Sequence, residues 1–376
     1  MAVTVLSFCI PTKNRAACLD KCLDAIFSSK YYDSELIEVV VSDNASTDNT
    51  QEVVEKYVAT QKGIIYNRNK ENLGVGGELN FIKVLSLANG KMLKLLNDYT
   101  VLTDEAINTY LTFAQEHYAT KPTAVFLNGK ARKEQICHSM DEMVYAAEWN
   151  LTWIGTHVYW KETWDALSDK TMAIDSCFMQ LDWCFRLFNE RENVYVERGD
   201  FFHNIKLPSN KVDYNWFDVH LTKFFSVLRP YVAREKIKKS TFNHVRHILY
   251  KSMYHSFKDR CFKQLGATES DRQKVISIFY RNFKDCWWFY VHFPFYVLKL
   301  YLKKWLGYWW IERRLSKGHE LIQLLFYGFF SEILAMFLRV DENVFSKFFV
   351  VYQMLYCVCH CLCVTNRCEQ SRFSIV

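Results

Sequence analysis

Polar side chains that can bind or transform a small molecule stand directly after apolar runs in this sequence. Asp43 and Asn44 end the run 38–41, Asn97 and Asp98 end the run 91–96, and the polar stretch 12–15 ends the first run. A carboxylate accepts hydrogen bonds from the N–H or O–H groups of a base or ribose, and the lysine and arginine in 12–15 suit a phosphate. The three clusters therefore indicate a ligand that carries both kinds of group.

Strand-like and helix-like patterns alternate over the first part of the chain. This alternation predicts a mostly parallel sheet covered by helices, an α/β fold. In such a sheet the carboxyl ends of the strands share one edge, so the three clusters converge on one crevice. For a single cluster the alternative explanation is that its side chains form turns and cap helices. That explanation accounts less well for three clusters that all follow predicted strands. The predicted strands are Val3–Ile10 (stopped by Pro11), Leu36–Val41, Gly63–Tyr66, Lys91–Leu96 and Thr123–Leu127, and the predicted helices are Arg15–Ser29, Thr47–Ala59, Gly77–Ala88 and Thr103–His117.

A glycine-rich stretch, "NRNKENLGVGGELNF", occupies residues 67–81. Glycines before a helix offer free backbone N–H groups and allow close approach of a ligand. The stretch is not a dinucleotide fingerprint, because G-x-G-x-x-G is absent and the loop follows the third strand. An ordinary loop that begins a helix is the alternative.

Composition narrows the class of protein. The chain has 376 residues, with 47 Lys and Arg against 41 Asp and Glu, an excess too small to favour nucleic acid as a partner. The first residues, MAVTVLSFCI, lack a basic leader, and the 13 cysteines are an odd number. Reduced thiols in the cytoplasm are therefore expected.

The second half of the chain is different in character. The pattern loosens from about residue 128 and is mainly helical beyond Trp216, with a soft boundary near 216–235. Residues 285–314 mix aromatic and basic side chains, as interfacial membrane segments do; a helix packed on the first domain or a homodimer surface is the alternative. Residues 345–364 are long enough to span a membrane but hold polar residues, and "CVCHCLC", 357–363, lacks the spacing of a zinc site.

Four stretches carry a family resemblance. "LSFCIPTKNRAACLDKCLDAI", "VVVSDNASTDNT", "NRNKENLGVGGELNF" and "MLKLLNDYTVLTDEAI" follow the order seen in bacterial family 2 glycosyltransferases. The chain resembles the branch that assembles capsule or lipopolysaccharide O-antigen sugars, specifically over residues 3–110 and more faintly to about 230. The resemblance implies the GT-A fold over 1–230, with nucleotide-sugar binding in 1–110, the acceptor side in 111–230 and a helical region in 231–376.

The resemblance also implies which residues hold a nucleotide-sugar donor. Asp43 would hold the base, Asn72 and Gly74 would lie near the ribose or diphosphate, and Lys13 or Arg68 would aid the departing diphosphate. The residues implied for the donor site are Pro11, Thr12, Asn14, Arg15, Asp43, Asn44, Arg68, Asn72, Gly74, Asn97 and Asp98.

The metal motif of the family is reduced here. Asp98 matches the first acidic residue of a D-x-D motif, whose carboxylates hold Mg²⁺ or Mn²⁺ against the donor diphosphate. The chain reads Asn97-Asp98-Tyr99-Thr100, with one carboxylate where the family has two or three. A divalent cation at Asp98 is the prediction, with His203 as a further candidate ligand.

The resemblance implies a catalytic base in "MQLDWCFRLF", residues 179–188. Asp182 would take the proton from the acceptor hydroxyl; a carboxylate that only stabilises the helix N-terminus is the alternative, and Asp175 is a rival base. Four tryptophans, Trp149, Trp153, Trp160 and Trp164, lie where an acceptor would dock, but core packing is the preferred interpretation of them.

These expectations combine into an inverting glycosyltransferase. It would pass sugar from a nucleotide-sugar donor to a glycan or lipid-linked acceptor in surface polysaccharide synthesis, at the cytoplasmic face of the inner membrane. The alternative is a catalytically silent relative that binds donor or partners as a scaffold. A sugar-phosphate nucleotidyltransferase is disfavoured because "IPTKNRAACL" has no glycine after the first strand.

Overall fold

The computed structural model describes residues 4–74, 77–129, 133–207, 215–263 and 268–306. Contacts divide the chain into two compact units, Met1–Tyr254 and His255–Val376. The segments 345–364 and 357–363, for which a membrane span and a zinc site were considered, lie outside the described residues.

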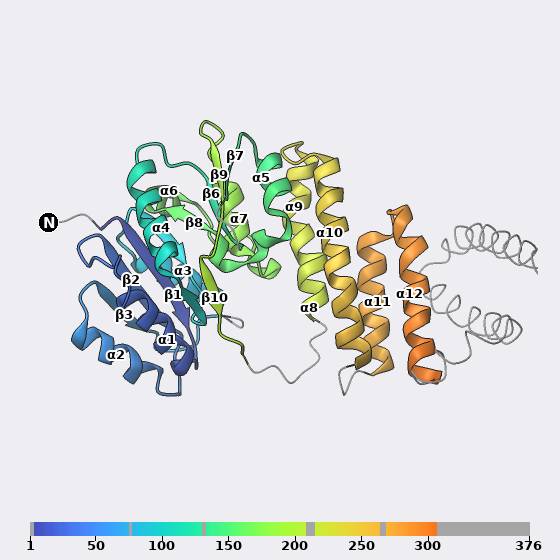
Figure 1. Ribbon diagram of the computed structural model, residues 1–376, viewed down its shortest axis with the longest axis horizontal. Coiled ribbons are helices and arrows are strands. Elements are labelled where there is room, and N and C mark those ends of the chain that lie inside the picture. The colour runs from blue at the N-terminus through green and yellow to red at the C-terminus, as the bar shows by residue number, and fades with distance from the viewer. Residues whose placement is uncertain (1–3, 75–76, 130–132, 208–214, 264–267, 307–376) are drawn as a thin grey trace, which may run out of the picture. The chain divides into compact units, whose positions relative to one another are not determined.

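A five-stranded sheet forms the centre of the first unit (Figure 1). Its strand order is β3-β2-β1-β4-β8, in which the first four strands are parallel and β8 is antiparallel to β4. This order places the ends of β1, β2 and β4 side by side at one edge, as the predicted alternation requires. The strands are β1 Leu6–Thr12, β2 Ile37–Asp43, β3 Ile64–Arg68, β4 Met92–Leu95 and β8 Val158–Trp160.

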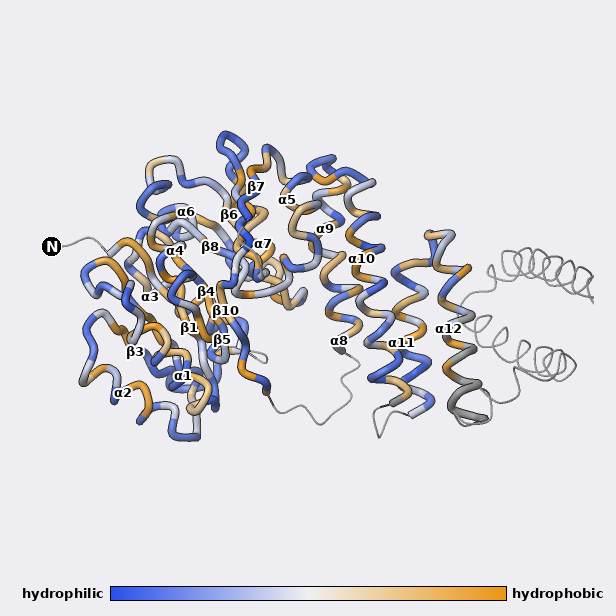
Figure 2. The backbone as a smooth tube through the Cα atoms, viewed as in Figure 1, coloured by the Kyte–Doolittle hydropathy of each residue, from blue (hydrophilic) through white to orange (hydrophobic). Residues whose placement is uncertain are grey.

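Both faces of this sheet are buried, which explains why its strands are continuous apolar runs. Alternate residues of β1 and β2, such as Phe8 and Val39, join one core with α1, α2 and α4. The helix α3 packs over the other face of β1 and β2. Figure 2 shows hydrophobic segments along the strands of the sheet. These helices are α1 Ala16–Phe27, α2 Thr50–Thr60, α3 Glu78–Leu87 and α4 Asp104–His117.

The first strand runs two residues further than predicted, through Pro11 to Thr12. Pairing with β2 continues to Thr12 opposite Asp43, whereas pairing with β4 ends at Cys9. The Cys9 carbonyl accepts from the N–H of Leu96, just after β4, and the Thr12 carbonyl accepts from the N–H of Asn44, just after β2. Successive residues of a strand point their backbone groups to opposite sides, so Pro11 points toward the side on which the β4 ladder has already ended. Its missing N–H therefore costs no ladder hydrogen bond.

Two smaller sheets complete the strands of the first unit; β6 corresponds to the predicted strand Thr123–Leu127, whereas β5 and β10 were not predicted. The strands β5 and β10 form an antiparallel pair, and β9 lies between β6, which is parallel to it, and β7, which is antiparallel. These strands are β5 Thr100–Leu102, β6 Ala124–Asn128, β7 Lys133–Cys137, β9 Val194–Gly199 and β10 Phe202–Asn204. The β5–β10 pair brings residues 202–204 beside the turn that follows β4.

Helices carry the remainder of the described chain. In the first unit they are α5 Met140–Ala147, α6 Lys161–Ala166, α7 Met179–Arg186, α8 Asn215–Phe217 and α9 Phe224–Ala233, with 3₁₀ turns at Glu148–Thr152, Ile154–Thr156 and Ile174–Ser176 and a π-helical turn at Asp218–Lys223. The helix α10, Lys239–Lys258, crosses the division between the units and continues into a π-helical turn, Asp259–Lys263.

The second unit contains α11 Glu269–Phe283 and α12 Trp287–Leu306. Its aromatic core includes Phe257, Phe279 and Phe293, and the rings of Phe279 and Phe293 stack at 4.7 Å between centroids. None of the helices within the described residues is both long enough and apolar enough to cross a membrane.

Candidate functional site

The turn between β1 and α1 forms one wall of the site at the carboxyl edge of the large sheet. Asn14 adopts a left-handed backbone (φ 53°), which asparagine tolerates better than most residues. Its backbone N–H donates to Ser46 Oγ at 2.9 Å and its side-chain Oδ1 accepts from the Thr47 N–H at 2.7 Å. The loops after β1 and β2 are therefore joined before any ligand binds.

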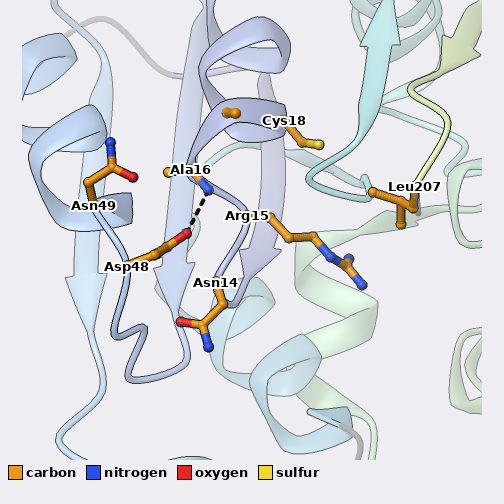
Figure 3. Close-up of a pocket in the computed structure, with 8 residues that line it drawn as sticks. Asn14, Arg15, Ala16, Cys18, Asp48, Asn49 and Leu207 are labelled. Atoms are coloured by element: carbon orange, nitrogen blue, oxygen red, sulfur yellow. Dashed lines mark hydrogen bonds between the residues drawn. The ribbon is translucent and has the colours of Figure 1, made fainter. Parts of the chain in front are cut away.

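A second link ties the starts of two helices together. Asp48 accepts hydrogen bonds from the N–H groups of Ala16 on α1, at 3.1 Å, and Thr50 on α2, at 3.1 Å. These bonds lower the pKa of Asp48 despite the opposing effect of its partial burial. A pocket of about 450 Å³ lies here, and Figure 3 shows Arg15 extending from the turn away from Asp48. It is lined by Asn14, Arg15, Ala16, Ala17, Cys18, Asp48, Asn49 and Leu207.

Asp43, at the end of β2, is fully buried. Its Oδ1 accepts from the Ser46 N–H at 2.9 Å, and its Oδ2 accepts from the Tyr66 hydroxyl at 3.1 Å. The Arg68 Nε lies 3.5 Å from the same Oδ2, and the Arg68 side chain is 43% exposed. Burial first, and then the Asp43 charge, raise the pKa of the Tyr66 phenol. The carboxylate is thus held rigidly and faces a cation that reaches solvent.

An amide network lies between Asp43 and the glycine-rich loop. Asn44 donates to Asn72 Oδ1 at 2.8 Å, and its own Oδ1 accepts from the Leu73 N–H at 2.7 Å. Behind it, the buried Asn69 donates to Asn80 Oδ1 at 2.9 Å. Asn69 and Asn80 were not predicted as site residues. The high asparagine content of residues 67–81 is the sequence signal that could have identified them.

The loop itself turns at Gly74, which has a left-handed backbone (φ 78°). A β-carbon there would stand 3.2 Å from the Glu78 carboxylate, so glycine is the residue that fits. The carbonyl of Gly74 accepts from Asn72 Nδ2 at 2.8 Å. Asn72 and Gly74 therefore lie together, on the same network as Asn44.

Asp98 follows β4 and is only 2% exposed. Its Oδ2 accepts from Thr12 Oγ1 at 2.8 Å, its Oδ1 accepts from Arg15 Nη1 at 2.8 Å, and the Lys13 backbone N–H also donates to it. Burial raises the pKa of Asp98, and the Arg15 charge offsets only part of that effect. The neighbouring Asn97 begins a turn, in which the Thr100 N–H donates to the Asn97 carbonyl at 3.1 Å.

Thr12 joins the two carboxylates. It pairs with Asp43 across the β1–β2 register and hydrogen-bonds Asp98 through its hydroxyl. Asp43 and Asp98 consequently stand at the same edge, on the two sides of β1. The structure thus brings together the predicted residues of β1, β2, β4 and the glycine-rich loop: Pro11, Thr12, Asn14, Arg15, Asp43, Asn44, Arg68, Asn72, Gly74, Asn97 and Asp98.

A divalent cation does not fit this arrangement of side chains. Both oxygens of Asp98 are engaged, one of them by the cationic Arg15. Thr100, at the position of a second D-x-D carboxylate, hydrogen-bonds Asn204 Oδ1 at 2.9 Å instead. His203 is exposed on β10, opposite Val101. Within the described parts of the chain, no three His, Cys, Asp or Glu side chains group as metal ligands.

Asp182 lies on α7 and is 7% exposed. Its Oδ2 accepts from Arg186 Nη1 at 3.2 Å, four residues along the helix. Burial raises the pKa of Asp182, against the effect of Arg186. The rival Asp175 is exposed in the 3₁₀ turn before α7. No hydrogen bond or ion pair described for Asp182 joins it to Asp43 or Asp98, so the structure does not bring this residue into contact with the strand-end cluster.

The tryptophans divide into two groups. Trp160 and Trp164 are buried, as the core interpretation predicts, whereas Trp153 is 38% exposed, so that interpretation is wrong for it. Trp153 packs on Phe202 of β10 at 6.2 Å between ring centroids. The preceding carbonyl, of Thr152, accepts from Gln180 Nε2 on α7 at 3.0 Å. Trp153 therefore contacts the strand of His203, and its neighbour Thr152 contacts the helix of Asp182.

Residues 7–161 match the family model described as Glycosyl transferase family 2. The chain is 28% identical over 207 residues to the abequosyltransferase RfbV of Salmonella typhimurium, a match that covers 49% of this chain and 61% of that protein. It is 32% identical over 114 residues to the GalNAc(5)-diNAcBac-PP-undecaprenol beta-1,3-glucosyltransferase of Campylobacter jejuni, covering 30% of this chain and 36% of that one. The matches thus span about two fifths to three fifths of these relatives.

Among solved structures, the chain is similar to S. aureus TarS 1-349, with a TM-score of 0.48, 13% identity and coverage of 73% of this chain and 79% of that one. It is also similar to the mannosyltransferase PcManGT from Pyrobaculum calidifontis in complex with GDP-Man and Mn²⁺, with a TM-score of 0.43, 14% identity and coverage of 81% and 87%. The strand order of the chain itself establishes the mixed α/β fold class that the sequence predicts. Residues 7–161 therefore match glycosyl transferase family 2, and the strand-end cluster lies within this part of the chain.

Proposed function

We propose that this protein is a glycosyltransferase that transfers a sugar from a nucleotide-sugar donor with inversion at the anomeric carbon. The observation that carries the proposal is the placement of Asp43 and Asp98 on the two sides of Thr12, at one sheet edge. Ligands of open α/β sheets bind at this edge. Asp43 suits the N–H groups of a base, and the exposed cations of Arg15 and Arg68 suit the diphosphate.

Asp182 is the proposed base. It would remove the proton of the acceptor hydroxyl while the acceptor oxygen bonds to the anomeric carbon and the bond from that carbon to the diphosphate oxygen breaks. A carboxylate whose pKa is raised by burial holds a proton more readily than an exposed one. Because the ligand-free carboxylate pairs with Arg186, binding of the acceptor must redirect it.

Trp153 gives the proposed acceptor side an aromatic face. It is exposed, it contacts Phe202 of β10, and its neighbour Thr152 accepts a hydrogen bond from Gln180 of α7. Aromatic faces pack well against apolar faces of sugar rings. An acceptor sugar stacked on Trp153 would stand between the donor edge and Asp182.

The acceptor is proposed to be a glycan or a lipid-linked glycan of a surface polysaccharide. Support comes from the undecaprenol-linked substrate in the name of the Campylobacter jejuni relative. The second unit is consistent with a membrane surface, since Trp287 is 77% exposed and Val291, one turn along the same helix, is 41% exposed. The divalent cation predicted at Asp98 is not part of this proposal, because Thr12 and Arg15 already hydrogen-bond the two Asp98 oxygens.

The test is hydrolysis of a panel of UDP-, CDP-, GDP- and dTDP-activated sugars by the wild type, Asp182→Asn and Asp175→Asn. Loss of a general base typically costs 10²- to 10⁴-fold in rate, so Asp182→Asn should fall by roughly that factor and Asp175→Asn should keep most of the wild-type rate. If the wild type and Asp182→Asn are equally inactive with every donor, the scaffold alternative replaces the transferase.

A further inference from the structure

A positive charge already stands at Asp98. The Arg15 Nη1 lies 2.8 Å from Asp98 Oδ1, and the guanidinium carbon lies 5.3 Å from the centre of the Tyr99 ring. The side chain of Arg15 is nevertheless 42% exposed. The guanidinium is therefore fixed from two directions and open from a third.

Arg15 lines the pocket of about 450 Å³ at the β1–α1 turn (Figure 3). Within the described residues, the hydrogen bond of the guanidinium goes to Asp98 through Nη1. Its Nη2 and Nε groups are thus available to a ligand in the pocket. A guanidinium presents two parallel N–H groups that match the oxygens of a phosphate.

Charge balance favours this arginine over an added metal ion. Asp98 supplies one negative charge, and Arg15 already neutralises it at hydrogen-bonding distance. A divalent cation would have to displace the arginine and would then find one carboxylate instead of two or three. The pair also keeps the Arg15 guanidinium protonated. Burial lowers the pKa of Arg15, but the charge of Asp98, the hydrogen bond to it and smaller neighbouring effects together raise this pKa by more.

We propose that Arg15, positioned by Asp98 and Tyr99, supplies the positive charge that stabilises the departing nucleoside diphosphate where related enzymes use a divalent cation. As the bond between the anomeric carbon and the diphosphate oxygen breaks, its electron pair stays on that oxygen, and the Arg15 N–H groups donate to the diphosphate. The proton of the acceptor hydroxyl goes to Asp182. This inference rests on the proposed function and names the cation that it uses.

The experiment compares the affinities of nucleoside diphosphates and monophosphates by calorimetry. UDP and UMP, CDP and CMP, GDP and GMP, and dTDP and dTMP are each titrated into the full chain, with EDTA and again with Mn²⁺. The wild type should bind one diphosphate equally well, within about twofold, in both conditions. Arg15→Gln should weaken the diphosphate by about tenfold or more and leave the matching monophosphate within about twofold, since a charge-assisted hydrogen bond is lost at the second phosphate. Arg15→Lys should recover part of that loss.

Lys21→Gln is the matched control, because Lys21 is an exposed cation on α1, the helix that follows Arg15, and it should behave as the wild type does. Diphosphate binding that requires Mn²⁺ would overturn the inference while leaving the proposed function in place. So would an Arg15→Gln protein that still binds diphosphate as Lys21→Gln does. A wild type that binds no nucleotide in either condition removes both the proposed function and this inference.

Discussion

Asp43 illustrates how one residue is prepared for a ligand by its neighbours. Its carboxylate is fully buried and accepts hydrogen bonds from Ser46 N–H and the Tyr66 hydroxyl. The Arg68 Nε is the weakest of its partners, at 3.5 Å, and belongs to a side chain that is 43% exposed. Movement of Arg68 would therefore open Oδ2 to a base without disturbing the bonds that orient the carboxylate.

Replacement of Asp43 by Asn should weaken nucleotide binding. The amide turns an N–H₂ group toward one of the donors that the carboxylate now accepts from, so affinity for the best-bound nucleoside diphosphate should fall about 10- to 100-fold. Calorimetry measures the change, and Asp24→Asn, an exposed carboxylate on α1, is the control. An Asp43→Asn protein that melts as the wild type does and binds nucleotide equally well would show that Asp43 does not hold the base.

His157 should make the fold sensitive to acid. It is fully buried, its Nε2 lies 2.8 Å from the Leu151 carbonyl, and its Nδ1 has no partner within the described residues. Burial lowers the pKa of His157 to about 4, with a smaller contribution from the charge of Lys94. The unfolded chain takes up a proton near pH 6.5, so the stability present at pH 7 is lost as pH falls from 6.5 to about 4.

The size of this loss follows from the difference in pKa, and it amounts to roughly 3 kcal/mol in the free energy of unfolding. Denaturant unfolding at pH 7 and pH 4 measures it. His157→Gln should unfold more easily at pH 7 but lose less stability between the two pH values, whereas His138→Gln, at an exposed position, should keep the wild-type difference. Equal pH dependence in the wild type and His157→Gln would contradict the prediction.

At the scale of elements, a network of buried hydrogen bonds joins the strands at the amino end of the large sheet, opposite the end that carries the candidate site. Gly90, before β4, donates its N–H to Ser7 Oγ at 2.8 Å, and that hydroxyl donates to Glu38 Oε1 at 2.7 Å. Glu38 is buried and also accepts from the Asn89 N–H. The network fixes the register of β1, β2 and β4, on which the alignment of Asp43 with Asp98 depends.

Gly90→Ala should therefore destabilise the first unit strongly. A β-carbon at this position would stand 2.4 Å from Ser7 Oγ and 2.8 Å from the Leu6 backbone carbon, and backbone cannot move aside as a flexible side chain does. Overpacking of this kind costs about 3 kcal/mol or more. Thermal unfolding followed by circular dichroism measures it, and Gly129→Ala, where the nearest atom is 3.9 Å away, is the control. Equal melting temperatures for the two variants would refute this account.

The elements that sequence reasoning found and missed differ in length and in periodicity. The large parallel strands were predictable because burial on both faces makes them continuous apolar runs. The strands β5 and β10 have three residues each and carry no period of their own. They pair over about a hundred residues of sequence, Thr100 with Asn204, and only the tertiary fold brings such segments together.

At the scale of the whole molecule, the exposed aromatic end of α12 is the feature that needs a partner. Trp287 is 77% exposed and Val291 is 41% exposed, while Arg281 and Lys284 nearby are exposed cations. Tryptophan prefers the headgroup region of a bilayer, and basic residues attract anionic lipids. We therefore expect the second unit to bind membranes that contain anionic lipids.

Trp287→Glu in the full chain should weaken binding to vesicles of phosphatidylglycerol and phosphatidylcholine by about tenfold or more, because a buried tryptophan contributes about 2 kcal/mol. Cosedimentation measures the bound fraction. Val58→Glu, which alters an apolar residue 46% exposed on the first unit, should bind as the wild type does. The prediction is contradicted if the wild type does not bind these vesicles, or if Trp287→Glu binds them as well as the wild type does. Either result would show that the exposed end of α12 does not bind membranes.

The sequence by itself determined the α/β class, the apolar strands that lead to the polar clusters at Thr12, Asp43 and Asp98, and the family resemblance of the first part of the chain, because buried strands and strand-end motifs are local patterns. The tertiary structure alone decided what the side chains at those ends do to one another. It paired Asp98 with Arg15, gave each Asp98 oxygen a side-chain hydrogen bond, joined Asn69 with Asn80 and left Trp153 exposed. Such contacts join residues that are distant in the chain or depend on how a whole surface packs, and no local pattern encodes them.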